Sequence, residues 1–249
     1  MVNQTKIPDQ AEREAFTVRV VREPVLVAHN TYEICVAKPS PTYSFCAGQS
    51  MKFCFGEEKC RSFSMVSAPH ENYLRFVYRG SSSTLKKNLA QLQKDTEVRI
   101  LDARGVCTYP EKENVPVLML TGGVGVAPCM SMLRHATYIR DTRTFVLLYA
   151  NRHVHDIVYK DELEAFRNTL RFSVEFFITG ETTSQDMHQG RFTVDTIKEY
   201  IKKLGEPIVY VIGPEGMVDA TLSLLERLSY PEENIKVRKF TGYIGEDDT

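Results

Sequence analysis

A glycine-rich turn between a buried strand and a helix limits the possible folds of this chain more than any other feature. Residues 115–120 form an uninterrupted apolar run, the segment Thr121-Gly-Gly-Val-Gly125 follows it, and a helical pattern then covers 128–139. Further apolar runs and amphipathic helical patterns alternate up to residue 240. Strands buried on both faces that alternate with helices form a parallel, doubly wound sheet. The second half is therefore predicted to be an α/β domain. Its expected strands are 115–120, 144–149, 172–178, 207–212 and 235–240, and its expected helices are 128–139, 159–167, 194–203 and 217–228.

The first half has a different pattern, made mostly of short β runs. Several of these runs alternate apolar and polar residues, as half-buried strands do, and turn residues separate them at short intervals. The expected strands are 16–21, 32–36, 51–55, 74–78 and 97–101. One helix is expected over 84–93, where Leu85, Leu89 and Leu92 share a face. This pattern predicts an antiparallel β-barrel. The polar, proline-containing stretch 110–114 is the expected boundary between domains 1–110 and 111–249.

Composition excludes several classes of function. The chain has 31 basic and 32 acidic side chains and a formal charge of -1, so no basic excess favours a nucleic acid. Its apolar runs are too short to cross a bilayer, and residues 1–15 lack the apolar core of a secretory signal. We therefore expect a cytoplasmic protein that binds neither nucleic acid nor membrane.

The cysteines and histidines predict no metal. The six cysteines form no C-x2-C pair, and in a chain without a secretory signal we expect all six to be reduced. An internal iron-sulfur cluster is therefore not expected. The six histidines show no metal-ligand spacing.

The glycine-rich turn is suited to binding a dinucleotide. A phosphate approaches the backbone closely only where side chains are absent, and the first amides of a helix point toward it. The predicted nucleotide residues here are Thr121, Gly122, Gly123, Gly125 and Pro128. A second turn at the end of a later strand adds Gly213, Pro214, Glu215 and Met217. Taken by itself, the second turn is explained equally well as a simple strand-to-helix connection.

The segment Arg61-Ser-Phe-Ser-Met-Val-Ser67 resembles the flavin motif of the ferredoxin-NADP reductase family, commonly Arg-x-Tyr-Ser-x-x-Ser. The resemblance extends from about residue 16 to 243, with the motifs in the family's order. The other matching segments are Gly48-Gln49, the stretch 78–85, the glycine-rich stretch 121–134 and the turn 213–217. The family's two-domain fold, a barrel followed by a parallel sheet, is the fold that the two halves predict.

The resemblance implies roles for the flavin residues. Arg61 would neutralise a phosphate of FAD, Phe63 would pack against the flavin, and Ser64 would place its hydroxyl near the flavin N5, as the catalytic group. The other residues it implies at the flavin are Ser62, Ser67, Gly80, Ser81, Ser82, Ser83 and Thr84. Two alternatives remain: Arg61 as an exposed strand charge, and 81–84 as a plain helix cap.

Several positions depart from the family pattern. Phe63 stands where tyrosine is usual, and Ile212 where many relatives have a cysteine near the nicotinamide. Tyr243, six residues from the end, is expected to be a surface residue more than a flavin shield. The family's NADPH enzymes place an arginine after the third strand of the second domain, where this chain has Thr179-Gly. Thr179 and Arg191 are the predicted contacts there, with Arg152 and His153 as further candidates. A solvated surface charge is the favoured alternative for Arg191, Arg152 and His153, so NADH is slightly favoured over NADPH.

The predicted function is that of a flavoprotein oxidoreductase with two cofactors, FAD and NADH or NADPH. It would pass electrons to a separate acceptor, with a ferredoxin or flavodoxin as the first expectation and an oxygenase component as another. A basic patch of Lys86, Lys87, Lys94 and Arg99 is a candidate docking surface for an acidic carrier. Two alternatives are an electron-transfer subunit with little turnover by itself and an NAD-binding sensor that holds no flavin.

Overall fold

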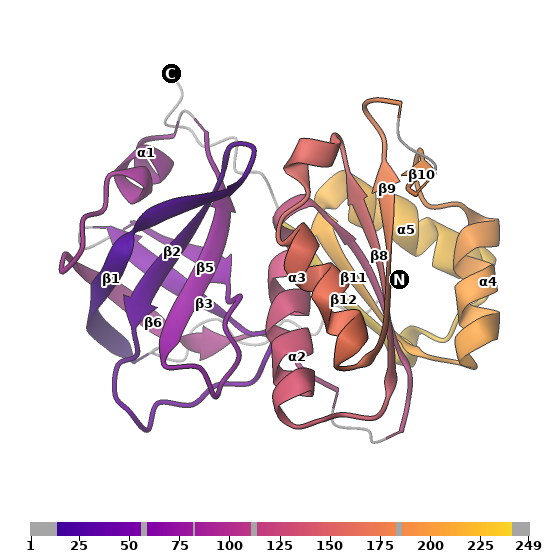
Figure 1. Ribbon diagram of the computed structural model, residues 1–249, viewed down its shortest axis with the longest axis horizontal. Coiled ribbons are helices and arrows are strands. Elements are labelled where there is room, and N and C mark those ends of the chain that lie inside the picture. Colours follow the sequence, from indigo (N-terminus) through magenta and orange to yellow (C-terminus); the bar gives the residue numbers. More distant parts are fainter. Residues whose placement is uncertain (1–13, 56–58, 82, 111–113, 183–185, 241–249) are drawn as a thin grey trace.

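The computed structural model describes residues 14–240 except 56–58, 82, 111–113 and 183–185. Two six-stranded sheets lie side by side, the first from the N-terminal half and the second from the C-terminal half (Figure 1). The predicted boundary at 110–114 falls between them, although residues 111–113 are outside the described part.

The first sheet is antiparallel and curls into a barrel-like shape. Its strands are β1 (Ala15–Ala28), β2 (Thr31–Ala37), β3 (Ser50–Phe55), β4 (Lys59–Ser64), β5 (Tyr73–Arg79) and β6 (Glu97–Arg104), in the order β4-β3-β6-β1-β2-β5. The outer strands β4 and β5 approach each other at one bridge, Met65 to Phe76, so the barrel is nearly but not fully closed. Alternate side chains fill its interior, among them Val20, Phe53 and Ile100. The expected helix is the shorter α1 (Thr84–Ala90), with Leu89 buried beneath it.

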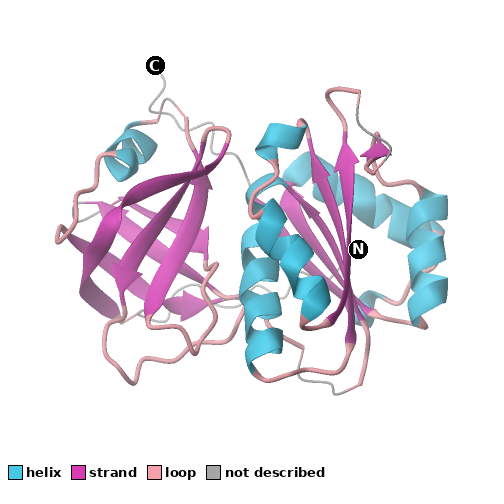
Figure 2. Cartoon of the chain, in the orientation of Figure 1, coloured by secondary structure: helices cyan, strands magenta, loops and turns pink. Residues whose placement is uncertain are grey.

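The second sheet is parallel, as the alternating pattern predicts. Its strands are β7 (Val117–Gly122), β8 (Thr144–Asn151), β9 (Arg171–Ile178), β10 (His188–Gln189), β11 (Ile208–Pro214) and β12 (Ile235–Phe240), in the order β10-β9-β8-β7-β11-β12. Its helices are α2 (Val126–Tyr138), α3 (Lys160–Ala165), α4 (Val194–Leu204) and α5 (Glu215–Arg227). Helices cover both sides of the sheet (Figure 2). Successive residues of β7 therefore enter different cores: Val117 and Met119 pack with α2, and Leu118 and Leu120 pack with α4 and α5.

The two halves share one apolar core where they meet. Val66 and Val77 of the first half belong to the same buried cluster as Val126 and Met130 of α2. Such a continuous apolar contact favours a fixed arrangement of two domains over free movement.

The expectation that all six cysteines are reduced is wrong for two of them. Cys54 and Cys60 form a disulfide between β3 and β4. The two residues lie directly opposite each other in the antiparallel register. Cysteine spacing along the chain does not report this register, which places the two thiols side by side. Cys35, Cys46, Cys107 and Cys129 are free.

Within the described ranges, no helix combines the length and apolar character that crossing a membrane requires.

Candidate functional site

The glycine-rich turn lies at the carboxyl end of β7, in the middle of the parallel sheet. Gly123 has a φ of 55° and starts a short 3-10 helix, η1 (Gly123–Gly125), that leads directly into α2. A Cβ on Gly125 would lie 2.6 Å from the Ile212 carbonyl oxygen, so a larger residue has no room there. The turn therefore needs glycine both for its backbone angle and for close packing.

The second predicted turn packs directly against the first. A Cβ on Gly213 would come within 3.2 Å of the Gly122 nitrogen, and the Met217 sulfur lies beside both glycines. The Thr121 hydroxyl donates to the Ile212 carbonyl at 2.8 Å and is fully buried, so it joins the two strand ends. Pro214 and Glu215 remain exposed at the start of α5. The two turns thus form one surface at the strand ends, where open α/β sheets bind their ligands.

Ile212 and Pro128 lie beneath this surface and not on it. The Ile212 side chain is fully buried in the domain core, and Pro128 is buried within the first turn of α2. Both side chains therefore pack beneath the turn and support its backbone.

The flavin motif lies on β4, at an edge of the first sheet. Arg61 and Phe63 are half-buried, and the Phe63 ring packs edge-on against Phe53 and Tyr78. The Ser62 hydroxyl donates to Ser50 at 3.2 Å. Arg61 and Phe63 are separated by one residue, so they project from the same side of the strand.

Ser64, the predicted catalytic group, has a buried hydroxyl with no hydrogen-bond partner among the described residues. Only 5% of this residue is exposed. A buried hydroxyl without a partner is uncommon, because it costs free energy to remove it from water. A bound group with a hydrogen-bonding atom at this point would satisfy it, and the flavin ring that the motif predicts is such a group.

Ser67 has a structural partner instead. Its hydroxyl accepts a hydrogen bond from the Arg75 amide at 3.0 Å, and the residue is fully buried. This bond joins the end of the flavin motif to β5.

The predicted pyrophosphate segment follows β5. Gly80 is held by the β1–β2 turn: its amide donates to the Asn30 carbonyl at 2.8 Å, and a Cβ would meet the Asn30 side chain. Ser81 and Thr84 are exposed, and Ser83 precedes α1 without a side-chain capping bond. Ser82 lies outside the described residues. The exposed hydroxyls are open to a ligand, but a role for them stays a prediction.

Helix α2 connects the glycine-rich turn to the flavin motif. Its Ser131 hydroxyl donates to the Ser67 carbonyl at 2.7 Å and accepts from the Gly48 amide at 3.1 Å. Its Arg134 donates to the Val66 carbonyl at 2.9 Å. One rigid helix thus begins at the predicted nucleotide turn and holds the backbone just after Ser64.

Two further polar groups were not singled out from the sequence. Both amide atoms of Asn151, at the carboxyl end of β8, are buried and lack partners among the described residues. The Tyr78 hydroxyl is also buried and lacks a partner among the described residues. Burial raises the pKa of Tyr78 to about 12, so the hydroxyl stays protonated. The position of Asn151 at a strand end was a usable signal, because ligand-binding groups gather there.

The two nucleotide contacts predicted after the third strand of the second domain, Thr179 and Arg191, lie near the carboxyl end of β9. Thr179 and Arg191 are exposed, and the Gly190 amide donates to the Ile178 carbonyl at 2.7 Å, which keeps Arg191 next to the end of β9. Arg152 is also exposed, and its side chain packs over Gly180. Both arginines are exposed near this strand end, and the slight preference for NADH stays a prediction.

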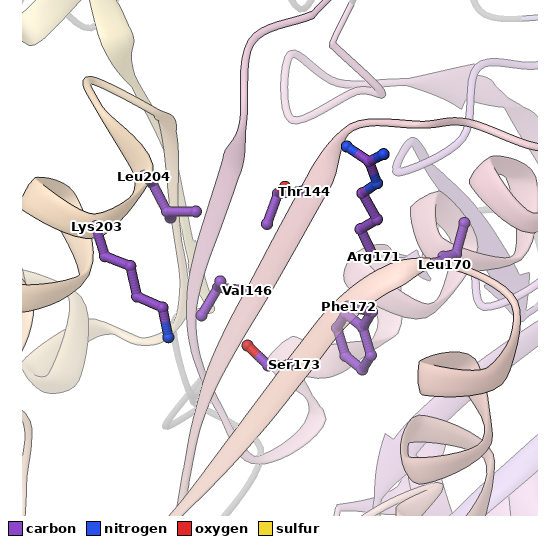
Figure 3. A pocket seen from close by; sticks show the side chains of 8 residues that line it. All are labelled: Thr144, Val146, Leu170, Arg171, Phe172, Ser173, Lys203 and Leu204. Carbon is purple, nitrogen blue, oxygen red and sulfur yellow. The ribbon is translucent and has the colours of Figure 1, made fainter.

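A surface pocket lies at the opposite end of the second sheet. Its lining comes from the amino-terminal ends of β8 and β9 and the end of α4, including Thr144, Arg171 and Lys203 (Figure 3). The glycine-rich turn lies at the carboxyl ends of these parallel strands, so the pocket is separate from the predicted cofactor surface.

Comparison with known proteins identifies the second domain. Residues 119–223 match the oxidoreductase NAD-binding domain. The chain is 32% identical over 204 residues to the reductase component of propane 2-monooxygenase from Rhodococcus jostii (strain RHA1). That match covers 75% of this chain and 52% of the relative, so the chain spans about half of the relative's length.

Solved structures share the complete two-domain fold. The flavohem-like FAD/NAD-binding domain of nitric oxide dioxygenase from Vibrio cholerae O1 biovar El Tor matches with a TM-score of 0.80 and 17% identity. That match covers 92% of this chain and 100% of the other. A ferredoxin NADP+ reductase from Neisseria gonorrhoeae, solved with FAD and NADP, matches with a TM-score of 0.75 and 19% identity, covering 93% and 100%. At these identities the likeness shows the fold.

Proposed function

The chain belongs to the ferredoxin-NADP reductase family of two-domain oxidoreductases, and on this premise we propose that it oxidises NADH or NADPH through FAD and passes the electrons to a separate protein. The observation that carries the proposal is the position of α2, which begins at the nucleotide turn and binds the backbone beside Ser64. Hydride transfer needs two rings at contact distance, and a shared rigid helix keeps the two binding surfaces in register.

The protein's own residues would bind and orient the two cofactors. Bound FAD supplies the change from two-electron to one-electron transfer. Arg61 would hold a phosphate, Phe63 would pack against the ring, and the Ser64 hydroxyl would donate toward N5, where electron density increases. The glycine surface of Gly122, Gly123 and Gly213 would admit the nucleotide pyrophosphate.

The acceptor must be supplied from outside this part of the chain. An iron-sulfur cluster requires several cysteine thiolates at one point. All six cysteines are described; two form a disulfide, and the four free ones do not gather into a cluster of three or more ligands. The Rhodococcus relative is the reductase component of an oxygenase system. We propose that the acceptor is likewise an oxygenase component or a ferredoxin-type carrier.

The first experiment is an anaerobic titration of the purified protein with NADH and, separately, NADPH. We expect a visible flavin spectrum that one nucleotide bleaches at stoichiometric amounts, which also decides the nucleotide preference. A colourless protein that gains no flavin spectrum on addition of FAD would refute the proposal and favour the NAD-binding sensor.

Ser64→Ala tests the catalytic assignment. Loss of one hydrogen bond to the reacting ring should slow flavin reduction by about tenfold, which corresponds to ~1.4 kcal/mol. Ser223→Ala is the control, because Ser223 is exposed on α5 and its hydroxyl donates to the Asp219 carbonyl within the same helix. Equal reduction rates in both variants would show that Ser64 has no role in the transfer.

The basic patch is the candidate docking surface for the acceptor. Lys87 and Lys94 are exposed at α1 and the turn after it, at the outer end of the first domain (Figure 1). Changing both to glutamate should lower kcat/KM for a ferredoxin by roughly tenfold at low salt and leave ferricyanide reduction unchanged. Lys198→Glu with Lys202→Glu, on the distant helix α4, is the matched control. Equal losses in the two double variants would refute docking at this patch.

A further inference from the structure

Three side chains that can ligate a metal meet where the two domains touch. His29 follows β1 in the first domain, and His155 and Asp156 lie in the short helix η2 (Val154–Asp156) of the second. The His29 Nδ1 atom is 3.4 Å from Asp156 Oδ1, and the His155 Nε2 atom is 3.9 Å from the same oxygen. All three ligand atoms lie within 4.8 Å of one another. Because His29 and Asp156 are 127 positions apart, no sequence spacing could indicate this cluster.

The backbone brings the two imidazoles together. The His29 amide donates to the His155 carbonyl at 2.9 Å, a direct hydrogen bond between the domains. The two rings are edge to face, with centroids 4.4 Å apart. The two residues are therefore neighbours because the domains dock at this point.

Asp156 is the fixed member of the cluster. Only 3% of it is exposed, and its Oδ2 accepts from the His153 amide at 3.2 Å. This bond anchors the carboxylate and leaves Oδ1 directed at both histidines. Arg79 also reaches Oδ1, at 3.2 Å, from a side chain that is about half exposed. The His153 ring stacks on His155 at 5.1 Å and restrains its orientation.

We propose that His29, His155 and Asp156 bind a transition-metal dication, with Zn²⁺ as the representative ion, and that the ion bridges the two domains. Two imidazole nitrogens and one carboxylate oxygen are ligands that Zn²⁺ prefers, with water completing a tetrahedron. Ligand distances of about 2.0–2.2 Å place neighbouring ligand atoms roughly 3.4 Å apart. The His29–Asp156 pair already has this spacing, and the other two pairs would have to contract from at most 4.8 Å. The two histidine side chains are 59% and 55% exposed, so an ion in solution can reach them.

The ligand set also discriminates between ions. Mg²⁺ and Ca²⁺ prefer all-oxygen sites, so two imidazoles disfavour them. A bound Zn²⁺ would displace Arg79 from Oδ1, and the half-exposed arginine has solvent available for its charge. Since the ligands come from both domains, the ion should oppose separation of the domains.

The test is a calorimetric titration of the full chain with Zn²⁺ in chelator-free buffer, with Mg²⁺ in a parallel titration. We expect one Zn²⁺ per chain, no heat with Mg²⁺, and a Zn²⁺-dependent rise in the thermal unfolding midpoint. His29→Ala and His155→Ala should each weaken binding by about tenfold or more, because each removes one of three ligands. The measurement needs neither flavin nor turnover, so its result is independent of the proposed reductase activity.

His188→Ala is the matched control. His188 is also an exposed histidine facing a carboxylate, with Glu175 at 3.1 Å, but it is at the far edge of the second sheet and has no second histidine. The His188→Ala variant should bind Zn²⁺ with the same affinity as the wild type. His29→Gln is a further variant that keeps the side chain's size and polarity if the alanine variant lowers stability without metal. Unchanged affinity in the His29 and His155 variants, wild-type binding weaker than millimolar, or an equal loss in His188→Ala would each overturn the proposal.

Discussion

Arg134→Ala should be among the most destabilising single changes at the domain interface. Arg134 is 8% exposed and donates to the Val66 carbonyl of the flavin domain at 2.9 Å. It also forms two bonds of 2.6 Å with the Glu162 carboxylate of α3, and its guanidinium lies 5.4 Å from the Tyr159 ring centre. One side chain thus joins α2, α3 and the segment that follows Ser64.

The three contacts give the expected magnitude. A charged donor to a buried carbonyl contributes roughly 1.5–3 kcal/mol. The Glu162 pair contributes no more than about 1 kcal/mol, because the Glu162 side chain is 37% exposed and water screens the interaction. The contact with the Tyr159 ring adds about 0.5–1 kcal/mol. We therefore expect the variant to lose about 2–5 kcal/mol of unfolding free energy.

Urea unfolding followed by circular dichroism measures this loss, and gel filtration followed by visible absorbance measures flavin retention. We expect weaker flavin retention, because Val66 is two residues from Ser64. Arg167→Ala is the control: Arg167 is exposed and donates to one backbone carbonyl, that of Val174, at 2.9 Å. It should lose less than about 1 kcal/mol. A loss in Arg134→Ala no larger than that of the control would refute the reasoning.

Three other perturbations have defined outcomes. Replacing Cys54 and Cys60 together by alanine should lower the unfolding free energy by about 2 kcal/mol in oxidising buffer, because the disulfide restricts the unfolded chain. A reducing agent should lower the unfolding free energy of the wild type by the same amount. An unchanged urea unfolding curve on reduction would contradict this. Burial alone would raise the pKa of Asp141, but hydrogen bonds from Arg143 and Tyr109 outweigh it and hold the pKa below its ordinary value. The stability that the charged Asp141 adds is present above about pH 4 and is lost as the pH falls through the lowered pKa. The unfolding free energy of Asp141→Asn should therefore fall less steeply with decreasing pH than that of the wild type. Equal pH dependence of the two proteins would exclude this role. Gly125→Ala should lower the unfolding free energy by about 1–3 kcal/mol, because its Cβ would lie 2.6 Å from the Ile212 carbonyl oxygen. The same change should weaken nucleotide binding, which a fluorescence titration measures. Gly216→Ala, with open space around it, is the control, and equal stability of the two variants would show that the turn tolerates a side chain.

The sequence predicted most of the fold because its signals are local. Every expected strand of both sheets is present, although β1 extends to Ala28 where the expected strand ends at 21, and β4 and β10 were not expected. Side-chain periodicity reports which face of an element is buried, and this information lies in neighbouring residues. The glycine-rich turn was readable for the same reason, since Gly123 needs its positive φ wherever the turn is placed.

The expected lengths of two short helices also differ from the structure. The helix expected over 84–93 ends at Ala90, although Leu92 is still buried as its spacing suggested. The helix expected over 159–167 divides into α3 and a short 3-10 turn. Helix ends depend on which carbonyl groups find other partners, and periodicity does not report this.

Candidate cofactor residues could be predicted from the sequence where they belong to a contiguous motif, as Arg61 and Ser64 do. Interactions that depend on contacts between distant segments of the chain could not be predicted from the sequence. The Cys54–Cys60 disulfide needed the register of a hairpin, and the Ser131 and Arg134 bonds needed α2 to dock on the first domain. The pairing of His29 with His155 likewise exists only because the domains meet there.

The sequence by itself thus determined the order of the elements, the two-domain division and the motifs that point to a flavin and a nucleotide. The tertiary structure alone decided which motif residues stay open to a ligand and which are used in packing. Ser64 and Thr121 illustrate the difference: both are buried hydroxyls in predicted motifs, but Thr121 bonds Ile212 and Ser64 has no partner among the described residues. The physical reason is that a hydroxyl's partner is set by whatever segment packs against it, and that segment can come from anywhere in the chain.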